Sequence, residues 1–156
     1  MNVIGFRYPE EENGYLSNWH ISYFKFDGIE YSSLEQYMMH QKAIYFGDED
    51  IAEEILSTDD PSEIKALGRK VSNFDSTSWN GVRQIIVYEG LCAKFSQNEE
   101  LKEKLKATGD AVLAECALND LIWGIGLSME DDISDVSEWR GQNLLGFALM
   151  MVRERL

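Results

Sequence analysis

The segment "SSLEQYMMHQKAIYFGD" (32–48) has the periodicity of a helix that is apolar on nearly every side. At helical spacing, Glu35, Met39, Lys42 and Phe46 share one stripe, and the other faces are also mostly apolar. Such a pattern is typical of a helix in a protein interior. A glutamate and a lysine on this stripe need an explanation, because buried charges are unfavourable unless they are paired or used in chemistry.

Hydrophobic patterning elsewhere predicts a mainly α-helical domain with a small N-terminal β-hairpin. A short strand is expected at "NVIGF" (2–6), and a hairpin at "YFKFDGIEY" (23–31), where Asp27-Gly28 supplies the turn. Ser32 is expected to cap the helix described above, and Gly68 to stop the helix that Asp60 begins. The expected helices are at 32–48, 49–56, 60–68, 78–95, 98–109 and 141–156. The segment "AVLAEC" (111–116) fits a strand or a short helix, and "LNDLIWGIGL" (118–127) a loop or strand against the core.

Length and charge narrow the range of functions. A chain of 156 residues suits one domain with one core, and we expect residues 1–156 to form it. The net charge of −14, from 14 basic and 28 acidic residues, argues against extended non-specific binding to nucleic acid. This charge does not exclude a small phosphorylated ligand that is bound locally by one or two cationic side chains. No apolar run has membrane length and the N-terminus lacks a signal-peptide pattern, so we expect a cytoplasmic protein that does not bind membranes.

Few side chains suit a metal site. Cys92 and Cys116 are far apart and belong to no metal or redox spacing, so both are expected to be small core residues. With His20 and His40 as the two histidines, a histidine-based metal site or a Ser-His-Asp relay has little to build with. We therefore expect neither a metal nor a cofactor.

Glu35 and Lys42 each have an ordinary structural explanation. Glu35 stands three residues after Ser32, which is the spacing of a capping box. Lys42 could extend its stem over apolar surface and keep its amine in water. The pair on one stripe is more suggestive than either residue alone, because a partly desolvated lysine becomes a usable amine nucleophile.

Other polar and aromatic residues have two interpretations as well. Asp48 ends the same helix and would also suit the N-cap of the next one. In "ECALNDLIWGIG" (115–126), acidic residues stand near Trp123 and two glycines, a combination that suits a stacked base or a plain turn with a core tryptophan. Basic side chains one helical turn apart, Lys65 and Arg69, could hold a phosphate or form a solvated face.

Several segments, taken together, resemble one known family. They are "LSNW" (16–19), "DGIEYSSLEQYMMHQKAIYFGD" (27–48), "IKALGR" (64–69), Trp79 with Arg83, "AKFSQNEEL" (93–101), "TGDAVLAECALNDLIWGIG" (108–126) and "WRGQNLLGFALMMVR" (139–153). In this order they are similar to the motifs of the NADAR, or YbiA-like, family over nearly the whole chain. Cys116 and Leu118 stand where smaller or polar residues would be expected. The resemblance implies a mostly helical domain with N-glycosidase activity.

The resemblance also implies two classes of substrate. One is a riboflavin-pathway intermediate, in which a phosphorylated ribosylamine is cut from its pyrimidine. The other is ADP-ribose on guanine, which some members remove from DNA to reverse a toxin, so an association with a toxin–antitoxin system is expected as well. Both classes present an anomeric carbon bonded to nitrogen. The alternative from another class is a module that binds ADP-ribose or a nucleotide without cleaving it.

On this resemblance, roles can be assigned to the candidate residues as hypotheses. Lys42 is the expected nucleophile or electrostatic group, Glu35 sets its protonation, and Asp48 or Asp120 transfers protons. The expected substrate-binding residues are Trp79 and Trp123 at the base, Arg69 and Lys65 at the phosphates, Asn18 and Trp19 at the ribose, with Glu115 and Gly124 beside them.

Overall fold

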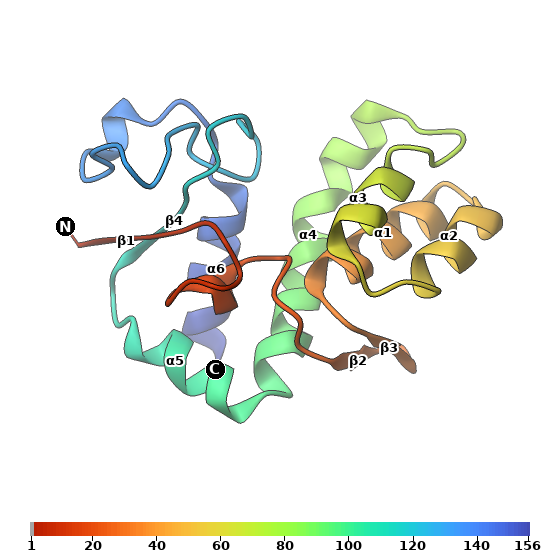
Figure 1. The fold of residues 1–156 in the computed structure, drawn as a ribbon, viewed down its shortest axis with the longest axis horizontal. Coiled ribbons are helices and arrows are strands. Elements are labelled where there is room, and N and C mark those ends of the chain that lie inside the picture. The colour runs from red at the N-terminus through yellow and green to blue at the C-terminus, as the bar shows by residue number, and fades with distance from the viewer. Residues whose placement is uncertain (1) are drawn as a thin grey trace. The chain divides into compact units, whose positions relative to one another are not determined.

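The computed structural model describes residues 2–156, and Figure 1 follows them in chain order. The chain divides into two compact units: residues 21–97 form one, and residues 2–20 with 98–156 form the other. Across residues 2–156, helices dominate and each unit holds one two-stranded sheet. The expected fold class, mainly helical with a small N-terminal hairpin, is confirmed.

The unit of residues 21–97 begins with the predicted hairpin. Strand β2 (Phe24–Phe26) pairs antiparallel with β3 (Ile29–Tyr31). At the turn, Asp27 and Gly28 have φ of 50° and 78°, so both central residues are left-handed. Such turns match the natural twist of paired strands, and Asp-Gly tolerates them best. The sequence prediction is therefore right in both place and mechanism.

Four helices complete this unit: α1 (Leu34–Tyr45), α2 (Glu49–Leu56), α3 (Pro61–Gly68) and α4 (Ser76–Ser96). Three of them begin at an aspartate whose carboxylate accepts a backbone N–H from the first turn, namely Asp48, Asp60 and Asp75. Such caps satisfy donors that the helix itself leaves unpaired. Helix α1 packs against the other three, which agrees with its apolar surface.

Glycines allow α1 to pack closely on its neighbours. A Cβ atom on Gly68 would overlap the Met39 sulfur, and one on Gly90 would overlap the Tyr37 ring. Gly68 is the last residue of α3, and the helix ends at Arg69, its C-cap, which is in the right-handed helical region. The prediction that Gly68 stops the helix is right in position, but the structure gives close packing as the reason for a glycine there.

The second unit is built around a parallel strand pair. Strand β1 (Val3–Phe6) pairs with β4 (Val112–Glu115), Val3 opposite Val112 and Phe6 opposite Glu115. The segment "AVLAEC" is thus a strand. Helix α6 (Leu144–Arg155) packs on β4, and a cluster of apolar side chains lies beside them: Ala114, Cys116, Ile125 and Leu127, with Val3, Ile133 and Trp139 against it. Cys116 is buried as expected, whereas Cys92 in the other unit is half-buried; both are free thiols.

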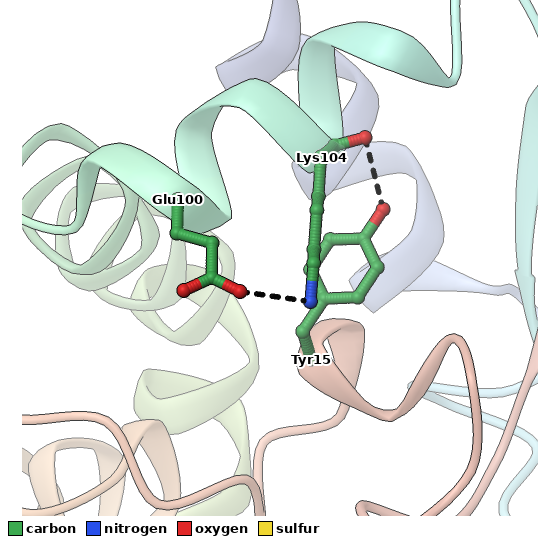
Figure 2. Close-up of polar contacts among 3 residues, drawn as sticks. All are labelled: Tyr15, Glu100 and Lys104. Atoms are coloured by element: carbon green, nitrogen blue, oxygen red, sulfur yellow. Dashed lines mark hydrogen bonds and ion pairs between the residues drawn. The ribbon is translucent and has the colours of Figure 1, made fainter.

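Helix α5 (Glu99–Ala107) has acidic residues in its first turn and basic residues in its last turn. Figure 2 shows how it meets the short 3₁₀ helix at Gly14–Leu16: the Tyr15 hydroxyl donates to the Lys104 carbonyl at 3.2 Å. The Lys104 ammonium lies 3.4 Å from Glu100 and 5.7 Å from the centre of the Tyr15 ring. The ion pair is exposed and contributes little, so the buried tyrosine is the main attachment. A second 3₁₀ turn, Val136–Glu138, precedes α6.

Candidate active site

Lys42 lies in the last turn of α1, in a partly buried position. Its amine donates a 2.9 Å hydrogen bond to the carbonyl oxygen of Gly68, at the end of α3. The same nitrogen lies 4.7 Å from the centre of the Phe74 ring, close enough for a cation–π contact. The amine is therefore fixed by a neutral carbonyl and an aromatic face. This arrangement differs from the snorkelling alternative, in which the amine would extend into water.

The surroundings of Lys42 lower the pKa of its amine. Burial lowers the pKa of Lys42; the carboxylate of Glu35 raises it and the guanidinium of Arg69 lowers it, and the result is below the ordinary value. A lower pKa means a larger fraction of free amine near neutrality, which is what a nucleophile requires. Glu35, Lys42 and Arg69 thus form one electrostatically coupled group, as the sequence analysis expected for the first two.

The capping explanation for Glu35 is wrong. Helix α1 is capped by Ser33, whose hydroxyl accepts the Gln36 N–H at 3.1 Å. The Gln36 side chain also reaches back past the cap, and its oxygen accepts the N–H of Ser32, the residue before the cap, at 2.7 Å. Two adjacent serines made the register ambiguous in the sequence. Glu35 is 5% exposed, and its charge acts on Lys42, so capping no longer accounts for a glutamate at this position.

Asp48 and the two basic residues of α3 lie at the surface of the same unit. One oxygen of Asp48 accepts the Ile51 N–H at 3.1 Å and the other accepts the Ser72 N–H at 2.8 Å. Hydrogen bonds from Ser72 and then Ile51 lower the pKa of Asp48. Lys65 and Arg69 are exposed and one turn apart, as a phosphate-binding pair would need to be.

Trp79 is buried among aromatic side chains of the same unit, and its role at the base stays a prediction. It is 7% exposed and packs against Tyr45 and Phe46, with ring centroids 6.4 Å away in each case. The exposed ring near Lys42 belongs instead to Phe74, which also meets Phe46 edge-on at 5.4 Å. Sequence reasoning missed Phe74, and its position between "SN" and "DS" offers no helical or strand periodicity that would have revealed it.

The second unit gathers another set of candidates around the end of β4. The buried Glu115 gives its backbone N–H to the side chain of Asn143 at 3.0 Å, and Asn143 donates to the Leu113 carbonyl at 2.8 Å. Asn143 is fully buried and left-handed, with φ of 54°. It fixes the strand end that carries Glu115. Sequence analysis missed this residue, whose signal is an asparagine directly before a helix.

Asp120, Trp123 and Gly124 form a tight turn after β4. One oxygen of Asp120, Oδ1, accepts the N–H groups of Ile122 and Trp123 at 3.0 and 2.9 Å, which leaves its second oxygen for other partners. A Cβ on Gly124 would approach the carbonyls of Glu115 and Asp120 to about 3 Å, so only glycine fits without a shift. The turn therefore brings Asp120, Glu115 and Gly124 close together and leaves the Trp123 side chain half-buried.

Asn18 and Trp19 follow the 3₁₀ helix of this unit. Asn18 is 7% exposed, and its side-chain oxygen accepts no hydrogen bond among residues 2–156. Trp19 is half-buried, and its backbone N–H donates to the Ser17 hydroxyl at 3.1 Å. A buried acceptor without a donor is costly, so Asn18 suits a ligand hydroxyl. The ribose role assigned to it remains a prediction.

A second buried amine lies on α4. Lys94 is fully buried, its nitrogen is 5.1 Å from the centre of the Phe95 ring, and burial lowers its pKa to about 7. Lys94 lies in the segment "AKFSQNEEL" (93–101), where its sequence context indicates no role. Because a low pKa alone suits a nucleophile, Lys94 is the natural rival of Lys42 in any chemical test.

Two kinds of feature were not found in the part of the chain that the structure describes. Within residues 2–156, no three His, Cys, Asp or Glu side chains are grouped so that they could hold a metal ion. In the same part of the chain, no helix combines the length and apolar character needed to cross a membrane.

Comparison with known proteins identifies the family. A sequence profile of the NADAR domain matches residues 5–156. The chain belongs to the NADAR family. It is 44% identical over 126 residues to an N-glycosidase of Acanthamoeba polyphaga mimivirus. The aligned residues are 80% of this chain and 74% of that protein. This chain is 33% identical over 154 residues to the N-glycosidase YbiA of Escherichia coli, which covers 99% of this chain and 88% of that one.

A solved structure and a longer relative extend this comparison. The NMR structure of Escherichia coli YbiA superposes with a TM-score of 0.81 at 32% identity, covering 99% of this chain and 84% of the other. A riboflavin biosynthesis protein of Vibrio vulnificus is 32% identical over 153 residues, which are 98% of this chain and 38% of that protein. This NADAR protein is thus an enzyme of the YbiA-like N-glycosidase family, as the sequence motifs predicted.

Proposed function

We propose that this NADAR protein hydrolyses the C1′–N bond between a phosphorylated ribosyl group and a base, with Lys42 as the nucleophile. The observation that supports this most is the amine of Lys42, held by the Gly68 carbonyl under the Phe74 ring. Burial also lowers the pKa of this amine, which increases the fraction of free amine at any given pH. A surface lysine with a structural role would need neither feature.

The proposed reaction proceeds in two stages. The neutral amine of Lys42 attacks C1′ as the C1′–N bond breaks, and the base leaves with a proton supplied by a carboxylic acid. The sequence offers Asp48 or Asp120 as this donor, and Asp48 is the less suited of the two by its own bonds, because both of its oxygens accept backbone N–H groups. The sugar on Lys42 then opens to an imine. Water adds to the imine carbon and releases the ribosyl product with the amine restored.

The charge of the site and a relative's name narrow the substrate. Lys65 and Arg69 offer exposed cations for a phosphate, whereas the net charge of −14 disfavours a long nucleic acid. One relative is named a riboflavin biosynthesis protein. We therefore place a riboflavin-pathway ribosylamine phosphate first. ADP-ribose on a single guanine comes second, since an unpaired modified base needs only local contacts.

Direct incubation with both substrate classes tests the proposal. The wild-type protein is mixed with the phosphorylated ribosylamine–pyrimidine intermediates and, separately, with single-stranded DNA carrying ADP-ribosylated guanine. We expect release of the free base from at least one of them, and none from the Lys42→Arg variant. Binding of either compound without release of its base would contradict the proposal and favour a non-catalytic binding module.

A further inference from the structure

The segment between α3 and α4 (69–75) brings an aromatic ring to the reactive amine. After Arg69 the chain turns at Asn73, which is left-handed with φ of 62°, and Phe74 follows directly. The Phe74 ring lies 4.7 Å from the Lys42 nitrogen and 5.4 Å from the Phe46 ring. It is 47% exposed, so the ring beside the amine lies at the surface of the unit.

Asp48 attaches this segment to the end of α1. Its two oxygens accept different backbone donors: Ile51, in the first turn of α2, and Ser72, two residues before Phe74. Asparagine would make one of these bonds but not both, because its second atom is a donor. The carboxylate therefore fixes the position from which Phe74 reaches Lys42. Both carboxylate oxygens of Asp48 thus already accept backbone hydrogen bonds.

We propose that Phe74 is a positioning residue that keeps water from the Lys42 amine, and that Asp48 acts in the reaction by holding the Phe74 segment through Ser72. This inference rests on the proposed function only in taking Lys42 as the reacting group. It changes the role of Asp48 from a proton carrier to a support for the ring. It also makes Phe74, and not the buried Trp79, the aromatic residue beside the reacting amine.

The test follows the titration of Lys42 without any substrate. The charged groups that act on this amine are Glu35 on α1 and Arg69 at the end of α3, and neither is changed in the variants below. The readout is the ¹³Cε chemical shift of Lys42 against pH, assigned with the Lys42→Arg protein. The variants are Phe74→Ala, Phe74→Leu and Asp48→Asn.

Matched controls separate this effect from a loss of helix caps. Asp60→Asn removes the carboxylate that caps α3 through Ser62 and does not hold residues 69–75. Because asparagine is also a good N-cap, both aspartate variants should stay folded. Phe74→Leu keeps apolar bulk over the amine but loses the aromatic face.

We expect Phe74→Ala and Asp48→Asn to raise the pKa of Lys42 towards its ordinary value, because water returns to the amine. The pKa of Lys42 should be lower in Phe74→Leu than in Phe74→Ala. In Asp60→Asn it should equal the wild-type value. Asp48→Asn should also lower kcat/KM by less than the roughly 100-fold that marks the loss of a general acid or base. Combining Asp48→Asn with Phe74→Ala should add nothing to the shift.

Unchanged titration of Lys42 in Phe74→Ala and Asp48→Asn would overturn the proposal. So would an Asp48→Asn enzyme that loses turnover completely while Lys42 titrates as in the wild type, since Asp48 would then carry protons. A protein that cleaves neither substrate class but shows the expected shifts would refute the proposed function and leave the positioning of Lys42 by Phe74 intact.

Discussion

The amine of Lys42 on α1 donates a 2.9 Å hydrogen bond to the carbonyl oxygen of Gly68 at the end of α3. This contact fixes the amine without supplying a negative charge, so burial still lowers its pKa. A carboxylate in the place of the carbonyl would have kept the amine protonated. The pairing of this lysine with a neutral acceptor therefore leaves its pKa below the ordinary value, as the proposed nucleophile requires.

The two charges that act on Lys42 should shift its reactivity in opposite directions. Glu35→Gln removes a charge that raises the pKa of Lys42, so the acid limb of the kcat/KM–pH profile should move to lower pH. Arg69→Gln removes a charge that lowers this pKa and should move the limb to higher pH. Lys65→Gln, one turn before Arg69, is the control and should leave the limb in place. If the acid limb lies at the same pH in the wild type and in all three variants, Lys42 does not control the profile.

The two glycines of α4 should respond oppositely to alanine. A Cβ on Gly90 would overlap the Tyr37 ring, so Gly90→Ala should destabilise the fold by about 1–3 kcal/mol through overpacking. Gly81 has nothing within 4 Å of an added Cβ, so Gly81→Ala should stabilise the helix by up to ~1 kcal/mol. Denaturant unfolding measures both. Equal effects at the two positions would contradict the packing described for α4 and Tyr37.

The sequence predicted the helices well, because their patterning and caps are local. Asp48, Asp60 and the Asp27-Gly28 turn act through hydrogen bonds or backbone angles within a few residues. The parallel pairing of Val3 with Val112 could not be predicted, since alternation indicates a strand but not its partner. The cap at Ser33 was displaced by one residue because Ser32 offers the same hydroxyl.

The site was predicted less completely than the fold, for physical reasons. Lys42 and Glu35 drew attention because charges on an apolar helix are conspicuous. The burial of Trp79 could not be predicted, because a tryptophan suits a core as well as a stacked base. Phe74 acts through a loop that Asp48 holds from 24 residues away, and the Gly68 carbonyl is a backbone group. Neither feature can be recognised from the pattern of residues in the sequence.

A buried histidine should make stability depend on pH. The Tyr31 hydroxyl and the His40 Nδ1 atom are 2.8 Å apart, and burial lowers the pKa of His40 from its ordinary 6.5. Below pH 6.5 the unfolded chain therefore binds a proton that the folded chain does not, so this contribution to stability is lost as the pH falls. His40→Asn should remove up to ~1.4 kcal/mol per pH unit of that slope. Identical slopes for the two proteins in urea unfolding would contradict this.

Trp123 should contribute to substrate binding and not mainly to stability. If its half-buried indole stacks on the base, Trp123→Ala should weaken binding by about 1–3 kcal/mol in calorimetry with a substrate analogue. Trp139 lies against the apolar cluster of the same unit and donates to the Ile133 carbonyl, so Trp139→Ala is the control that should lose stability instead. If the Trp123→Ala protein is unstable yet binds the analogue normally, Trp123 has a structural role in the core and does not contact the base.

The most direct test of the account is to trap the enzyme during turnover with borohydride. Reduction of the proposed imine should leave the ribosyl group on the peptide that contains Lys42, as mass spectrometry would show. Lys42→Arg should give no adduct and lose on the order of 10³-fold or more in kcat/KM with little change in stability, since guanidinium keeps the charge but is no nucleophile. An active Lys42→Arg enzyme, or an adduct on Lys94 in place of Lys42, would contradict the account.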